Sequence, residues 1–248
     1  MAVETQYELP SWDVLLSWGE EAISAANLAA EIETDPGTAN LLVALAAAAR
    51  CRRLMMGVVA LVEANLPDVM GVLLRTLFEC WLAGTFALVG GQEALARLTA
   101  ERIYQENQLA RVLGEPGDDT SESRRSNVAD LADRVARLLE DRGNENAGFA
   151  RAGYETIYRY ESHRSIHGGL GSVAGHIFED ETLRTITPAR PEQDSFVRHK
   201  FLIGVSLLVS AAQMVAIDAD LPHAALDRLG DRILGLDPRR NRDSSADG

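Results

Sequence analysis

Apolar and small side chains recur at helical spacing along most of the 248-residue chain. The stretch 39–65 is typical, because its apolar positions fall on one face of a helix. This pattern predicts an all-α fold, a single bundle of about seven to nine helices with long apolar helices at its centre. The expected helices are 12–33, 39–65, 67–89, 92–113, 127–142, 147–166, 191–219 and 221–236.

Short polar residues, proline and glycine mark where these helices begin and end. Ser11, Thr38 and Ser126 are the expected N-caps, since a hydroxyl can accept a hydrogen bond from a free backbone amide. Pro67 suits the first turn of the third helix. The pair Gly90-Gly91 is expected to stop that helix.

The segments between the predicted helices consist mainly of small and polar residues. Residues 114–123 have the composition of a loop, and 185–188 indicate an extended connector ahead of a proline. We therefore expect one helical domain over 11–236, followed by a disordered tail over 237–248.

The formal net charge of −13 and the pI of about 4.8 disfavour binding to nucleic-acid phosphates or to anionic membranes. The first ten residues lack the pattern of a secretion signal. Cys51 and Cys80 lie in apolar helical runs without metal-ligand or redox spacing, which favours buried free thiols in a reducing compartment. These features together predict a cytoplasmic protein.

Two apolar stretches, 69–89 and 201–217, resemble membrane spans by composition. Arg75 and Glu79 stand near the middle of the first, and the second contains Ser206 and Ser210. We expect both to be core helices, with no membrane association.

Arg75 and Glu79 are two charged residues on an otherwise apolar helix. Four residues apart, they share one side of the helix and can form an ion pair. Because burying such a pair seldom stabilises a protein, the pair indicates either a structural role in specificity or a polar ligand pocket. Arg52, on the apolar stripe of the preceding helix, could add a second cation to the same interior or extend to the surface.

A second polar cluster, 158–169, contains Tyr158, Arg159, Ser162, His163 and His167. The two histidines share a helix face, but the spacing offers no third metal ligand, so no metal site is assigned. Beside two glycines at a helix end, His167 can act as a general acid or base with Ser162 or Tyr158 as neighbour. Alternatively, a protonated histidine there complements the helix dipole.

The segment Leu74-Arg75-Thr76-Leu77-Phe78-Glu79, followed later by Tyr158, Ser162 and His167, resembles a bacterial helical domain family of unknown function. Members of that family pair an Arg-Ser/Thr-Leu-x-Glu helix with a later Ser-x-x-x-x-His helix end. The resemblance covers about 41–169. It implies that Arg75, Glu79, Ser162 and His167 form one site, without indicating a reaction.

Helical ribonucleases of the HEPN class have an arginine and a histidine with four to six residues between them. None of the candidate pairs, which combine Arg159 or Arg164 with His163 or His167, has that spacing. A ribonuclease toxin or defence protein is therefore only an alternative.

Our leading hypothesis is a ligand-binding or enzymatic bundle. Its candidate catalytic residues are Arg75, Glu79, Ser162 and His167, and its candidate binding residues are Tyr158, Arg159, His163 and Arg52. The other hypothesis is a regulatory protein that forms a homo-oligomer through its apolar helices, with the Arg75/Glu79 pair fixing their register. No motif identifies a cofactor or a small-molecule ligand.

Overall fold

A computed structural model describes residues 9–28, 38–66, 69–114, 127–144, 146–159 and 194–236, together with the backbone of 177–179 and 184–186. The described part is overwhelmingly helical, which confirms the all-α class. Ser162, His163 and His167 lie outside the described residues, as do the expected N-cap Ser126 and the expected first-turn residue Pro67.

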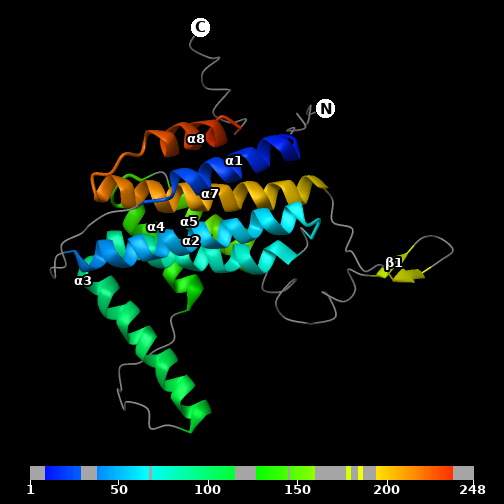
Figure 1. The fold of residues 1–248 in the computed structure, drawn as a ribbon. Helices are drawn as coiled ribbons and strands as arrows, with labels where there is room; N and C mark the ends of the chain where they lie inside the picture. Colours follow the sequence, from blue (N-terminus) through cyan, green and yellow to red (C-terminus); the bar gives the residue numbers. More distant parts are fainter. Residues whose placement is uncertain are drawn as a thin grey trace, which may run out of the picture.

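Within the described residues, the elements follow one another as five α-helices, a π-helical segment, two short strands and two further α-helices (Figure 1). They are α1 (Trp12–Ala25), α2 (Ala39–Glu63), α3 (Met70–Leu113), α4 (Val128–Glu140), α5 (Ala147–Gly153), η2 (Tyr154–Arg159), β1 (Ile177–Glu179), β2 (Arg184–Ile186), α7 (Asp194–Asp218) and α8 (Ala224–Leu234). The strands pair antiparallel, with Ile177 opposite Ile186. The first two residues of the connector expected at 185–188 therefore belong to β2.

Several helix ends differ from the expectation. Helix α1 ends at Ala25 and the chain has left the helix by Asn27, so the predicted end at Glu33 is wrong. Helix α4 is capped by Asn127, whose side-chain oxygen accepts a hydrogen bond from the backbone amide of Ala129. The helix expected over 147–166 changes at Tyr154 from α to π geometry.

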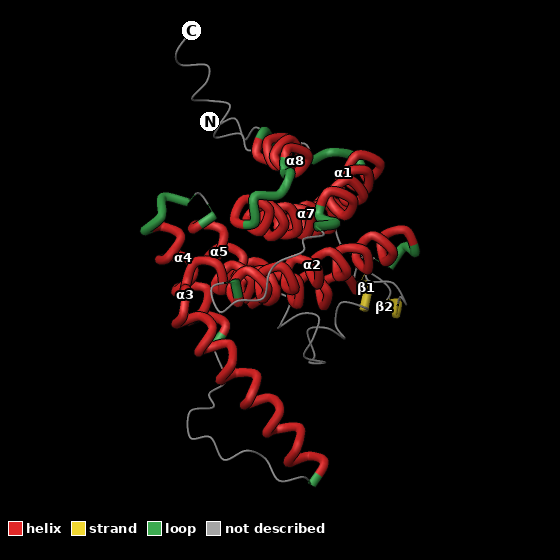
Figure 2. The backbone as a smooth tube through the Cα atoms, turned by 60° about the vertical axis from the view of Figure 1, so that its left-hand side comes forward, coloured by secondary structure: helices red, strands yellow, loops and turns green. Residues whose placement is uncertain are grey.

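Helix α7 lies between two layers. Helices α2 and α3 run side by side on one of its faces, and α1 and α8 cover the other (Figures 1 and 2). At the centre the buried Trp81 donates a hydrogen bond from Nε1 to Oγ of Ser210 on α7, over 3.0 Å. Its ring stacks on Phe78 and meets the ring of Phe149 edge-on. These contacts bring α3, α5 and α7 together on one side chain.

Helices α3 and α7 are long and apolar enough to cross a bilayer by length and composition alone. The core helices of soluble proteins pass the same test, and 56% and 61% of the two apolar windows are buried inside this protein. Both helices thus contribute to the core, as the sequence predicted.

Helix α3 changes direction at Gly91, where the backbone leaves the helical region (φ 57°, ψ −138°). Beyond this residue the helix diverges from the packed body (Figure 2). A residue with a Cβ is strained in that conformation, whereas glycine adopts it freely. The stop expected at Gly90-Gly91 therefore takes the form of a kink between two helical arms.

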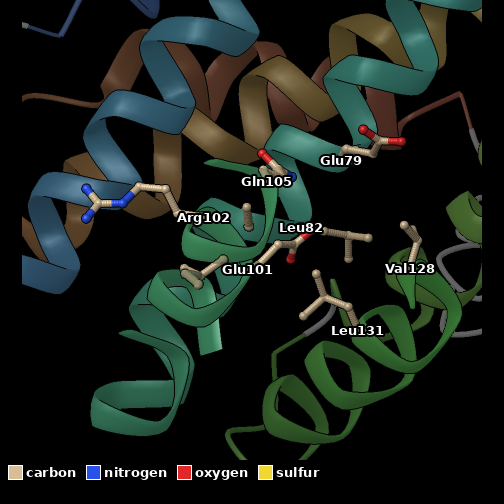
Figure 3. Close-up of a pocket in the computed structure, with 9 residues that line it drawn as sticks. Glu79, Leu82, Glu101, Arg102, Gln105, Val128 and Leu131 are labelled. Carbon is tan, nitrogen blue, oxygen red and sulfur yellow. The ribbon is translucent and has the colours of Figure 1, made fainter. Parts of the chain in front are cut away.

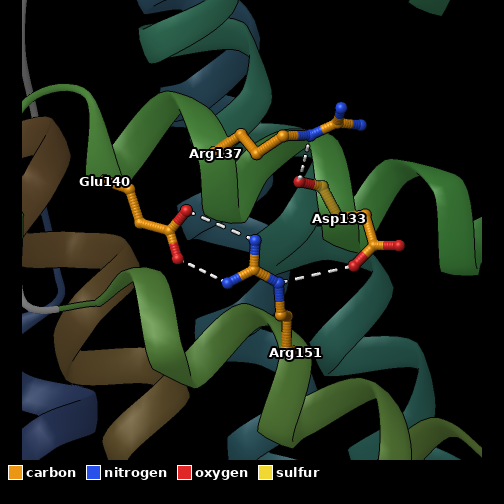
Figure 4. Close-up of polar contacts among 4 residues, drawn as sticks. All are labelled: Asp133, Arg137, Glu140 and Arg151. Carbon is orange, nitrogen blue, oxygen red and sulfur yellow. Dashed lines mark hydrogen bonds and ion pairs between the residues drawn. The ribbon is translucent and has the colours of Figure 1, made fainter.

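Helices α4 and α5 are joined by Arg151 (Figure 4). Its guanidinium donates to both carboxylate oxygens of Glu140 on α4, and its Nε lies 3.5 Å from Oδ1 of Asp133. The hydrogen bond from Arg151 lowers the pKa of Glu140, and the guanidinium charge adds to the shift. This two-pronged contact links α5 to α4 at the surface.

The Glu140 contact predicts a pH-dependent stability. Since the pKa of Glu140 is lower in the folded protein, its stabilisation is complete above the unfolded pKa and is lost as the pH falls through the folded pKa. We expect the difference in Tm between wild type and Glu140→Gln to be largest near neutral pH and to vanish in acid. Circular dichroism melts across a pH series measure it, and a difference that does not change with pH would contradict it.

Candidate functional site

A polar pocket of about 510 Å³ lies where the two arms of α3 meet α4 and η2. Its lining comes from four places: Arg75 and Glu79 before the kink, Glu101, Tyr104 and Gln105 after it, Asn127 and Val128 at the start of α4, and Tyr158 on η2. A second pocket of about 270 Å³ shares Glu79, Glu101, Gln105 and Val128 and continues onto Leu82, Leu98 and Leu131 (Figure 3). The two form one polar-to-apolar groove, which we call the α3–α4 groove.

The groove exists because of the kink at Gly91. Glu79 and Glu101 are 22 residues apart, which corresponds to about 33 Å along a straight helix. Both nevertheless line the same two pockets. Only a change of direction between them can bring these carboxylates to one groove, and Gly91 is where the chain makes that change.

Arg75 is held on two sides. Its Nε donates to Oε1 of Glu79 at 3.3 Å, and its Nη2 donates to the hydroxyl of Tyr158 at 2.9 Å. The guanidinium carbon also lies 4.4 Å from the centre of the Tyr158 ring, a cation–π contact. Only 17% of the Arg75 side chain is exposed, against 40% for Glu79. The arginine is therefore a fixed part of the wall, with the glutamate facing the groove.

Tyr158 reaches Arg75 because η2 comes unusually close to α3. A Cβ placed on Gly153, the last residue of α5, would lie 2.5 Å from Cε2 of the buried Phe78. No side chain fits in that gap. The following turn has π geometry, and it stacks the rings of Tyr154 and Tyr158 with centroids 5.6 Å apart. The glycine and the stacked rings thus direct the Tyr158 hydroxyl to the arginine.

Glu101 is the groove's second carboxylate. It is half-buried and forms no hydrogen bond or ion pair with any residue that the structure describes. In Figure 3 its carboxylate points from α3 toward the space bounded by Leu82 and Leu131, whereas the guanidinium of Arg102 points away from it. The Nε atom of Arg102 instead lies 3.5 Å from Oε1 of Glu106. The charge of Glu101 is thus directed into the groove.

The structure brings together three of the predicted site residues, Arg75, Glu79 and Tyr158. Arg52 does not join them, since its Nε donates to the carbonyl oxygen of Ile23 at 2.7 Å and ties α2 to α1. Arg159 is exposed and pairs with Glu155 on its own helix, away from the groove.

The sequence reasoning missed Glu101, Tyr104, Gln105 and Asn127. Glu101, Tyr104 and Gln105 stand on an amphipathic helix of ordinary composition, where a carboxylate normally faces solvent, and Asn127 is the N-cap of α4. A signal was nevertheless present, because Gly90-Gly91 indicated a break that could fold the second arm back on the first.

The alternative role of the Arg75/Glu79 pair was to fix the register of an oligomer. Within the described part of the chain, Arg75 has its partners in its own subunit, Glu79 and Tyr158. These contacts link α3 to η2, and the role in fixing an oligomer's register stays a prediction.

No protein-family model matches the chain, and no match is found among curated proteins or solved structures. The resemblance carried by 74–79 and the later Tyr158, Ser162 and His167 therefore stays a prediction.

The gap between Gly153 and Phe78 can be tested by a matched pair of substitutions. Gly153→Ala should lower the free energy of unfolding by about 1–3 kcal/mol, because the new methyl group must push η2 away from α3. Gly148→Ala on the same helix is the control, since a Cβ there meets no atom within 4 Å and alanine favours the helix. Urea unfolding measures both, and equal stability of the two variants would show that the close approach is absent.

Proposed function

We propose that the protein binds a small organic cation in the α3–α4 groove, with Glu101 as the principal anionic contact. The observation that carries this proposal is the half-buried Glu101 carboxylate, which faces both pockets and has no ion-pair partner among the described residues. A desolvated carboxylate is costly unless a positive charge compensates it. A ligand with an amine or related cationic group supplies that charge.

The electrostatics of the groove favour a cation over an anion. Glu79 and Glu101 contribute two carboxylates, while the guanidinium of Arg75 is already engaged by Glu79 and Tyr158. An anionic ligand would have to displace Glu79 or Tyr158 from Arg75. It would also lie close to the carboxylate of Glu101. The net charge of −13 adds a long-range attraction for cations.

The apolar end of the groove suggests the rest of the ligand. Leu82, Leu98 and Leu131 line the pocket of about 270 Å³, next to the Glu101 carboxylate. An alkyl or aromatic group attached to the cation would bury apolar surface there. The adjoining polar pocket of about 510 Å³ is in the size range of small-molecule sites, and the mixed lining of the groove fits an amphiphilic amine.

The described residues of the α3–α4 groove can bind a ligand through charge, hydrogen bonds and apolar contact. The wider proposal is that one helical bundle of about seven to nine helices over 11–236 forms this site. Ser162 and His167 would supply a nucleophile and a base if they complete it. Binding by the described residues does not depend on that addition.

Two probes of similar shape and opposite charge test the proposal, phenylbutylamine and phenylbutyrate. Titration calorimetry at constant low salt should show that the amine binds and the carboxylate does not. In Glu101→Gln the affinity for the amine should fall at least about tenfold, equivalent to about 1.4 kcal/mol.

The control is Glu20→Gln, which removes the same charge from an exposed position on α1. Its affinity for the amine should match that of wild type. An equal loss in both variants would mean that only the net charge attracts the amine. Binding of phenylbutyrate in preference to phenylbutylamine would also overturn the proposal.

A further inference from the structure

Cys51 on α2 and Cys80 on α3 lie where these two helices pack against each other. Close to them, a Cβ added to Gly84 would lie 2.8 Å from Cβ of Ala47, so small residues let the two backbones approach. The thiol of Cys51 lies 3.7 Å from the carbonyl oxygen of Leu77, one helical turn before Cys80. Each thiol also lies close enough to the other to shift its pKa. Residues 29 positions apart in sequence are thus placed as a pair.

The two cysteines have different surroundings. Cys51 is fully buried, whereas Cys80 is partly exposed. The neighbouring Cys80 thiol raises the pKa of Cys51 well above its ordinary value, and burial adds to the rise. The Cys51 thiol in turn lowers the pKa of Cys80, helped by the charge of Arg50 and opposed by desolvation and by Glu79. Cys80 is therefore the more readily ionised sulfur.

A small, largely enclosed cavity adjoins Cys80. It is lined by Cys80 together with Ala44, Ala47 and Gly84, among others, and has a volume of about 10 Å³. That is about the smallest cavity that can hold one water molecule. Hydrogen peroxide is little larger than water, so it can reach the sulfur more easily than a branched organic hydroperoxide can.

We propose that Cys51 and Cys80 form a reversible disulfide within the chain when the protein meets hydrogen peroxide, with Cys80 reacting first. The Cys80 thiolate attacks one peroxide oxygen, an S–O bond forms, the O–O bond breaks, and the other oxygen leaves as water after taking up a proton. Cys80 is then a sulfenic acid. Cys51 attacks the Cys80 sulfur, the S–S bond forms, and the S–O bond breaks to release a second water that carries the Cys51 proton.

In this reaction two thiols are oxidised by two electrons and one peroxide is reduced to two waters. A dithiol reductant reverses it by thiol–disulfide exchange. The product covalently links α2 to α3 beside Glu79, a residue of the α3–α4 groove. The inference does not depend on what that groove binds.

The experiment uses the full reduced chain treated with hydrogen peroxide, followed by thiol alkylation, digestion and mass spectrometry. We expect a peptide pair joined through Cys51 and Cys80, with two hydrogen atoms lost, which disappears on treatment with dithiothreitol. Oxidation by tert-butyl hydroperoxide should be at least severalfold slower. Loss of both thiols without the joined pair, or joining only between two chains, would overturn the proposal.

Two single variants test the order of the steps. In Cys51→Ala, peroxide should leave a sulfenic acid on Cys80 that dimedone traps, whereas Cys80→Ala should give little trapping on Cys51. Equal trapping in the two variants would overturn the assignment of Cys80 as the first sulfur. The wild-type experiment decides whether the disulfide forms even if one variant folds poorly.

Discussion

The change of direction at Gly91 is the constraint on which the proposed site depends. Its backbone conformation is open to glycine, and a Cβ there would meet no atom within 4 Å. The constraint thus lies in the backbone torsions and not in crowding. At Gly90 the reverse holds, because a Cβ would lie 2.8 Å from the Phe86 ring and 2.9 Å from Cβ of Ala94. Gly91 permits the change of direction, and Gly90 permits the close packing beside it.

The first arm of α3 belongs to the core, and its two charged residues must be accommodated there. Arg75 is satisfied by Glu79 and by Tyr158, which arrives from a segment 83 residues later. This contact needs η2 to lie against Phe78, and Gly153 provides the space. The contacts that satisfy Arg75 in the core thereby also form one wall of the groove. The second arm adds Glu101, whose charge no described residue neutralises.

The sequence predicted much of this fold because helical periodicity, prolines and glycines are local signals. The all-α class, the core role of α3 and α7 and the break at Gly90-Gly91 all followed from such patterns. It also singled out Arg75, Glu79 and Tyr158, since charges in an apolar helix and a polar cluster are visible in one dimension. The sequence could not show which neighbouring helix each side of a helix faces. The side of α2 that Arg52 occupies, and the way the second arm of α3 turns back, depend on tertiary packing.

The pairing of Cys51 with Cys80 was hidden for the same reason. Their spacing of 29 residues matches no local redox motif, and only the packing of α2 on α3 brings the thiols together. The π-helical turn at Tyr154 was equally invisible, because its sequence is compatible with an ordinary α-helix. Both features arise where helices approach closely through small residues.

The distance between the two arms of α3 tests the account most directly. Spin labels on Val72→Cys and Leu109→Cys, in a chain that also carries Cys51→Ala and Cys80→Ala, report it by double electron–electron resonance. These exposed positions are 37 residues apart, or about 56 Å in a straight helix. The account predicts a distribution centred well below that value. A distribution centred near it would mean that α3 is straight, and that the groove formed by Arg75, Glu79 and Glu101 does not exist.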